Sequence, residues 1–219
     1  MSEYITVGKA WETRNKGVVV QTTRPPVDHL SDMVSVVWQD QRLISPEQRR
    51  KAYALMGEIS VWSGMRTDEV KLTMKHDFLQ RHIERLHKEL FSLADCDMTT
   101  ARDFISYLID FMLEFDVPSR QPLYDLCDDI SRYVYGCMMQ KKCAVCGRKA
   151  DLHHVDRIGM GGDRKEICHI GMQALPLCRE HHMEAHQHGD AALMAKYHLE
   201  SLAIDEKIAK KYRLGGQKQ

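Results

Sequence analysis

Apolar and polar positions recur with helical spacing through the middle of the chain. Near Ser45 the order Ser-Pro-Glu-Gln supplies a capping serine, a proline in the first turn and Gln48 at the capping-box position. This pattern predicts a helix over Ser45–Ser63 that stops at Gly64. A short helix is expected from Thr67. Another apolar stripe follows at Leu79, Ile83, Leu86 and Leu90.

Two more helices are expected further along. Thr100-x-x-Asp103 predicts the start of an amphipathic helix, whose apolar face would carry Phe104, Leu108, Phe111, Met112 and Phe115. Such aromatic and methionine stripes usually belong to the core, and a dimer surface is the alternative. Residues 118–122 interrupt the pattern with two prolines, and a helix from about Leu123 to Met139 is expected after them.

The first forty residues favour strands. Three segments are rich in β-branched residues and are separated by Asn-Lys-Gly and Pro-Pro turns: Tyr4–Thr13, Gly17–Thr23 and Met33–Gln39. Together with the helices that follow, and a hairpin expected near residue 150, they predict the α+β class.

Composition limits the functional classes. The 219 residues are 43% hydrophobic and 28% charged, as in an ordinary globular protein. The formal net charge is zero, so any nucleic-acid contact must come from local patches. No apolar run approaches the roughly 18 residues that span a bilayer. No charged-then-apolar leader is seen, which predicts a cytoplasmic location without membrane contact.

Four cysteine and histidine residues have the spacing of a structural zinc site. Two residues separate Cys143 from Cys146, and two separate Cys178 from His181. This double spacing predicts a closed tetrahedral site with three thiolates and one imidazole. The alternative is a set of unrelated buried thiols and imidazoles. Cys168 fits neither metal site and is taken as a small apolar residue.

The remaining histidines suggest a second, open site. His182 and His186 are four residues apart in a predicted helix over Cys178–Gly189, so their rings share one face. His153 and His154 follow a short stretch expected to be one arm of a hairpin. Neighbouring strand residues point to opposite faces, so one of the pair can bind a cation while the other handles a proton. A histidine-rich zinc module that only binds nucleic acid remains the alternative.

The order of these motifs resembles the HNH endonucleases, whose ββα-metal fold packs a hairpin over a helix with one catalytic cation between them. The resemblance implies that His153, His182 and His186 bind this cation and that His154 is the general base. The spacing of His182 and His186 is similar to that of the colicin-type nucleases. Implied products carry a 5′-phosphate and a 3′-hydroxyl, with zinc in the structural site and Mg2+ or Mn2+ as the catalytic ion.

One position departs from the family pattern. The family's asparagine, which braces the hairpin and orients the base, corresponds to Gln173, just before Ala-Leu-Pro-Leu-Cys. The only asparagine in the chain is Asn15. Gln173 supplies the same amide one methylene further out and is therefore the expected second catalytic residue, with His169 as the alternative.

A glycine-rich loop lies between the histidine pair and the last motif. It contains Arg157, Arg164 and Lys165, which are expected to contact DNA phosphates. The alternative is a simple hairpin connection.

The N-terminal half resembles the lambda NinB/Orf recombination-mediator family. The resemblance rests on Val37-Trp38, on residues 45–60 with Trp62 and Gly64, and on the helix after Thr100. It implies a homodimer that binds single-stranded DNA and single-strand-binding protein. Expected DNA contacts are Arg42, Arg49, Arg50, Lys51, Arg66 and Lys71, with Trp38 and Trp62 as stacking surfaces. The alternative is a solvated helix face with ordinary core tryptophans.

Together these patterns predict an Orf-like domain at residues 1–122, a linking helix at 123–140 and an HNH domain with a zinc knuckle at 141–219. The expected function is a DNA endonuclease of phage recombination or replication, acting on single-stranded or branched DNA with His154 as base. The alternative is a catalytically silent recombination mediator with a zinc-stabilised DNA-binding module. A restriction-type enzyme is a third possibility, but no base-reading element is evident.

Overall fold

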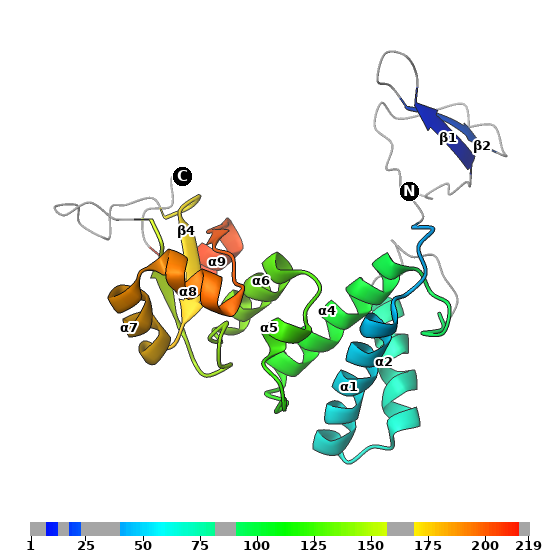
Figure 1. Cartoon of the computed structure of the whole chain (residues 1–219), viewed down its shortest axis with the longest axis horizontal. Coiled ribbons are helices and arrows are strands. Elements are labelled where there is room, and N and C mark those ends of the chain that lie inside the picture. Colours follow the sequence, from blue (N-terminus) through cyan, green and yellow to red (C-terminus); the bar gives the residue numbers. More distant parts are fainter. Residues whose placement is uncertain (1–7, 13–17, 23–39, 82–90, 157–168, 215–219) are drawn as a thin grey trace. The chain divides into compact units, whose positions relative to one another are not determined.

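The computed structural model divides the chain into two compact units, Met1–Gln39 and Asp40–Gln219 (Figure 1). It describes all residues apart from 1–7, 13–17, 23–39, 82–90, 157–168 and 215–219. Among the described residues, no helix is long and apolar enough to cross a membrane.

The first unit contains an antiparallel strand pair. Strand β1 spans Gly8–Glu12 and strand β2 spans Val18–Thr22, with Gly8 opposite Thr22. Both lie inside predicted strands. The third predicted strand, Met33–Gln39, lies outside the described residues.

The second unit combines helices with a small sheet, which confirms the α+β class. Its elements are α1 (Pro46–Ser63), α2 (Thr67–Arg81), α4 (Met98–Glu114), α5 (Leu123–Leu126), α6 (Ile130–Gln140), β3 (Asp151–His154), β4 (Gln173–Leu177), α7 (Arg179–His188), α8 (Asp190–Tyr197), β5 (Leu202–Ala203) and α9 (Glu206–Tyr212). The predicted domain limits at residues 122 and 140 both lie inside this unit and stay a prediction.

The local signals of α1 produce the predicted helix. The Ser45 side chain accepts a hydrogen bond from the backbone N–H of Gln48, and the Gln48 side chain accepts one from the backbone N–H of Ser45. At the other end Gly64 takes the left-handed conformation that a side chain disfavours, with φ of 72°. Gly64 N–H donates to the carbonyl of Ser60, which closes the helix.

Helices α1, α2 and α4 lie against one another (Figure 1). Their buried side chains form an aromatic core. The ring of Phe78 on α2 makes edge contacts with Phe104 on α4 and with Phe91, at centroid distances of 5.3 and 5.7 Å. Helix α2 is four turns long rather than short because its inner face, including Val70 and Phe78, is buried in this core.

Two predicted helix boundaries are wrong. Helix α4 begins at Met98 and not at Thr100, because Asp97 is the capping residue and accepts the Thr100 backbone N–H at 2.8 Å. The single helix expected over Leu123–Met139 is broken after Leu126. Asp129 adopts an extended conformation there and caps α6 by accepting the Arg132 backbone N–H.

The C-terminal part is built on an antiparallel sheet in the order β3–β4–β5. His153 lies opposite Leu175 and His154 lies opposite Ala174. Helix α7 follows β4 directly and packs against it, so the hairpin and this helix form a ββα unit. Buried Tyr133 of α6 donates its hydroxyl to the carbonyl of Ala144 at 2.8 Å, which anchors the segment before β3 to the core.

Candidate metal centre

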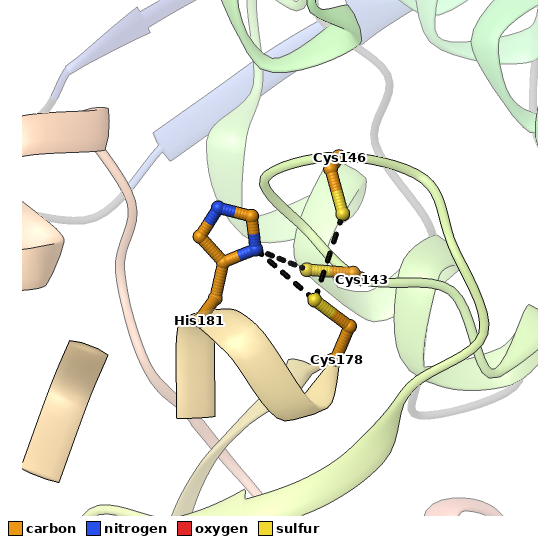
Figure 2. Close-up of side chains that lie close together, drawn as sticks. All are labelled: Cys143, Cys146, Cys178 and His181. Atoms are coloured by element: carbon orange, nitrogen blue, oxygen red, sulfur yellow. Dashed lines mark hydrogen bonds between the residues drawn. The ribbon is translucent and has the colours of Figure 1, made fainter. Parts of the chain in front are cut away.

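The first donor set is assembled from a knuckle and the start of α7. Figure 2 shows the sulfur atoms of Cys143, Cys146 and Cys178 and the ring of His181 turned toward one another. His181 Nδ1 lies 3.5 Å from Cys143 Sγ and 3.2 Å from Cys178 Sγ, and Cys146 Sγ lies 3.7 Å from Cys178 Sγ. All four donor atoms lie within 4.8 Å of one another. The predicted four residues therefore form one cluster.

These distances fit a tetrahedral zinc. Zinc–sulfur bonds of about 2.3 Å hold two ligand sulfurs about 3.8 Å apart, close to the separation of the Cys146 and Cys178 sulfurs. Burial lowers the pKa of His181, which keeps its ring neutral and able to bind a metal. Burial raises the pKa of the Cys143 thiol to about 12 in the metal-free chain, so a bound metal ion would have to displace its proton.

Arg148 adds positive charge beside the thiolates. Its Nε donates to Cys146 Sγ at 3.3 Å, and its guanidinium pairs with Glu180 on α7. Burial alone would raise the pKa of the Cys146 thiol, but hydrogen bonds with Arg148, Cys143 and Cys178 together lower it. Arg148 thus stabilises the anionic form that a zinc ligand requires. Arg148 was not predicted to be part of the site, although its position two residues after Cys146 points to this contact.

The second donor set joins the hairpin to α7. His153 on β3 and His182 and His186 on α7 each offer a ring nitrogen, and the three nitrogens lie within 4.8 Å of one another. The His153 ring centroid is 4.5 Å from that of His182 and 5.3 Å from that of His186. His153 is buried, His182 is half-buried and His186 is exposed. The set therefore opens to solvent on the side of His186.

The chemistry of this set suits a divalent cation that keeps open coordination positions. Three neutral imidazoles leave room for water and phosphate, unlike the closed set with three thiolates. Burial lowers the pKa of His182, and the neighbouring His153 and His186 lower it further. The His182 lone pair is thus available near neutral pH. Imidazole ligands alone do not select among zinc, nickel and manganese.

His154 follows His153 on β3 and contacts another histidine. Its Nε2 is 2.9 Å from Nδ1 of His169, which is buried. Gln173 does not make this contact. Its backbone N–H donates to Asp156 Oδ2 at 2.7 Å, and its side-chain oxygen accepts from the Ser201 hydroxyl at 3.0 Å. Of the two candidates for orienting His154, the structure brings His169 to the ring.

The expected DNA contacts divide into two groups. Arg157, Arg164 and Lys165 lie outside the described residues. On α1, Arg49 donates to the carbonyls of Leu93 and Ala94, and Lys51 pairs with Asp128 and Glu47. Only Arg50, among the three predicted α1 residues, is exposed without a bond to another described side chain. Their role toward DNA stays a prediction.

The structure also describes the other residues of the N-terminal half that are expected to bind single-stranded DNA, apart from Trp38, which lies outside the described residues. Arg42 pairs with Asp40, Arg66 pairs with Asp68, and Lys71 lies 5.6 Å from the centre of the Tyr53 ring. Trp62 is partly exposed and contacts the rings of Phe111 on α4 and of Phe115, which follows α4, at centroid distances of 6.3 and 6.5 Å.

A further contact was not foreseen from the sequence. Asp190, the first residue of α8, lies 2.7 Å from Nε2 of His153. The two residues are 37 positions apart, and a single aspartate after Gly189 gives no local signal of this pairing.

Comparison with known proteins is consistent with this geometry. A family model described as "Putative HNHc nuclease" matches residues 22–215. The match includes both donor sets and every element of the second unit. No curated protein and no solved structure gives a significant match.

Proposed function

Because the chain belongs to the HNHc nuclease family by a match over most of its length, we propose that it is a metal-dependent DNA endonuclease. The observation that carries the proposal is the presence of two distinct donor sets, one on the ββα unit and one between its helix α7 and the preceding cysteine knuckle. Cys143, Cys146, Cys178 and His181 would hold a structural zinc, and His153, His182 and His186 would hold the catalytic cation. His154 lies on the same strand as His153, next to the open set.

The proposed reaction is hydrolysis of a phosphodiester bond with His154 as general base. When bound, Mg2+ or Mn2+ would neutralise the charge that develops on the phosphate oxygens. In this proposal Nδ1 of His154 would take the proton of the attacking water, because Nε2 contacts Nδ1 of His169 at 2.9 Å. For this, Nε2 of His154 carries the other hydrogen and donates it to Nδ1 of His169. The expected products carry a 5′-phosphate and a 3′-hydroxyl.

In this proposal, two residues together replace the family's asparagine, which orients the base and braces the hairpin. His169 orients the base through the 2.9 Å contact with His154. Gln173 braces the hairpin, because its backbone binds Asp156 at the end of β3 and its amide binds Ser201 before β5. Both roles position other groups, so neither residue needs to touch the substrate.

The proposed setting is phage recombination or replication, with single-stranded or branched DNA as substrate. The Orf-like pattern of the N-terminal half supports this setting, as do exposed Arg50 and Trp62, which are suited to a phosphate and a base. Binding to single-strand-binding protein and formation of a homodimer are further parts of the proposal. Both follow from the same resemblance.

A panel of labelled DNAs tests this function: duplex, single-stranded, flap and four-way-junction molecules, each with Mg2+, Mn2+ or EDTA. Wild type should cut at least one of them with a cation present and none in EDTA. His154→Ala should lose this activity, while His76→Ala, which removes an exposed histidine of α2, should keep it. Cleavage that His154→Ala retains in full would refute the assigned base.

The second candidate function is a catalytically silent recombination mediator. One observation favours it: the Gln173 amide, at the family's asparagine position, binds Ser201 and not His154. In this case the C-terminal half would be a zinc-stabilised module that binds DNA. Tight binding of single-stranded DNA, with no cleavage of any substrate under any cation, would establish this function instead.

A further inference from the structure

The buried histidine of the open set is held by a carboxylate from another helix. Oδ1 of Asp190 lies 2.7 Å from Nε2 of His153, the separation of a charge-assisted hydrogen bond. The His153 side chain is 4% exposed and that of Asp190 is 30% exposed, so the bond is largely shielded from water. Such shielding strengthens the bond and holds the ring in one orientation.

The chemistry of this pair fixes which ring nitrogen carries hydrogen. An ionised carboxylate can only accept a hydrogen bond, so Nε2 of His153 must carry the hydrogen. In a neutral ring the lone pair then resides on Nδ1. A hydrogen bond from the second ring nitrogen to a carboxylate also makes a histidine a stronger metal ligand. Asp190 therefore prepares the His153 ring to bind a cation through Nδ1.

Asp190 is a hydrogen-bond partner of a candidate metal-binding histidine and not a candidate metal ligand itself. Among the described residues, the set whose donor atoms lie within 4.8 Å of one another contains three histidines and no carboxylate. Asp190 is thus outside the group that could share one ion.

The fold delivers this carboxylate through the turn between α7 and α8. Gly189 ends α7 and precedes α8 with φ of 91°, a conformation that side chains rarely adopt. Its N–H donates to the Ala185 carbonyl and its own carbonyl accepts from Leu193, so one residue terminates one helix and starts the next. The α7–Gly189–α8 segment therefore supplies two histidines of the set and the partner of the third.

We propose that Asp190 is a positioning residue that fixes the ring tautomer and orientation of His153 for the catalytic cation. This inference rests on the metal-dependent function proposed above. It predicts that the open set loses affinity when Asp190 loses its charge, although no ligand atom is removed. The zinc cluster, which does not contact Asp190, should be unaffected.

Titration of the full-length, zinc-loaded protein with Co2+ tests the proposal, with affinity measured by calorimetry and by the visible absorption of the bound ion. Asp190→Asn should bind Co2+ about 10- to 100-fold more weakly than wild type, with zinc content unchanged. Asp151→Asn is the matched control. It removes an exposed carboxylate whose charge also acts on His182 but which makes no hydrogen bond to the set. Its affinity should stay within about threefold of wild type.

Equal Co2+ affinity of wild type and Asp190→Asn would overturn the role of Asp190 and leave the nuclease proposal standing. Failure of wild type itself to bind Co2+ at the histidines would overturn both. A second measurement does not depend on any variant: nitrogen-15 NMR of the metal-free wild type reports the His153 tautomer. Hydrogen on Nε2 supports the proposal, and hydrogen on Nδ1 contradicts it.

Discussion

Truncation of His169 is the most informative perturbation of the proposed catalytic base. His169→Ala removes the ring whose Nδ1 lies 2.9 Å from Nε2 of His154. His154 keeps its place on β3 opposite Ala174 but loses this hydrogen bond. The base is therefore present but less firmly oriented.

The expected loss of rate follows from this one contact. A net hydrogen bond of about 1 kcal/mol corresponds to about a fivefold change in rate. A ring that also shifts from its productive position can cost up to about 100-fold. Removing the base itself, as in His154→Ala, should cost about 100- to 10,000-fold. His169→Ala should therefore slow cleavage by about 5- to 100-fold, less than His154→Ala.

Single-turnover cleavage of a labelled oligonucleotide at saturating cation measures these rates directly. His169→Asn should recover much of the rate, because its amide oxygen can accept the hydrogen of His154 Nε2. His76→Ala, on the exposed side of α2, should cleave like wild type. Thermal unfolding of each variant shows whether the fold is retained. A lower rate of His169→Ala can then be assigned to loss of the buried His169 ring and not to unfolding.

The double variant decides whether His169 acts through the base. If it does, His154→Ala combined with His169→Ala should be no slower than His154→Ala alone. Losses that multiply in the double variant would refute the reasoning and assign His169 an independent role.

Three further predictions concern the metal sites and the cysteines. Cys178→Ser should lose the bound zinc and unfold the ββα unit, because zinc binding of about 10–16 kcal/mol is comparable to the whole stability of a domain. Metal analysis and circular dichroism check this prediction. A variant that melts like wild type without bound zinc would contradict it. Burial raises the pKa of Cys137 to about 12 and of Cys127 to about 11. Both thiols should therefore resist alkylation by iodoacetamide at mildly alkaline pH in the folded protein, which peptide mass mapping can measure. Rapid labelling of Cys137 would contradict its burial. Because the folded pKa of His182 is lowered, protonation of His182 competes with a cation only when the pH falls below the ordinary histidine value of about 6.5. Co2+ affinity should therefore fall as the pH drops well below that value, and an affinity that stays unchanged there would contradict His182 as a ligand.

Signals confined to a few neighbouring residues were sufficient to predict parts of this structure. The reciprocal bonds of Ser45 and Gln48 and the left-handed Gly64 set both ends of α1. The spacing of Cys143 and Cys146 likewise predicted half of the zinc cluster, because a two-residue gap lets both sulfurs reach one ion.

Other features depend on choices that the local sequence leaves open. Asp97 and Thr100 are both good capping residues, and in the structure Asp97 caps α4 while the Thr100 hydroxyl donates to its carboxylate. The apolar pattern runs through Cys127 without a break, so the interruption before Asp129 could not be predicted from periodicity.

Contacts between distant residues were predicted at most as alternatives: His169 was expected only in place of Gln173, and no role was expected for Asp190. His169 reaches His154 across 15 positions, and Asp190 reaches His153 across 37. Both contacts arise only after β3, β4 and α7 have packed together, and neither follows from a recognisable spacing.

The central claim is that His154 serves as the base beside a cation held by His153, His182 and His186. The most direct test measures cation affinity and cleavage rate on the same samples of wild type and His154→Ala. The account predicts equal affinity for Mn2+ in both proteins and a rate at least about 100-fold lower in the variant. Equal rates at equal occupancy, or loss of Mn2+ binding in His154→Ala, would contradict it.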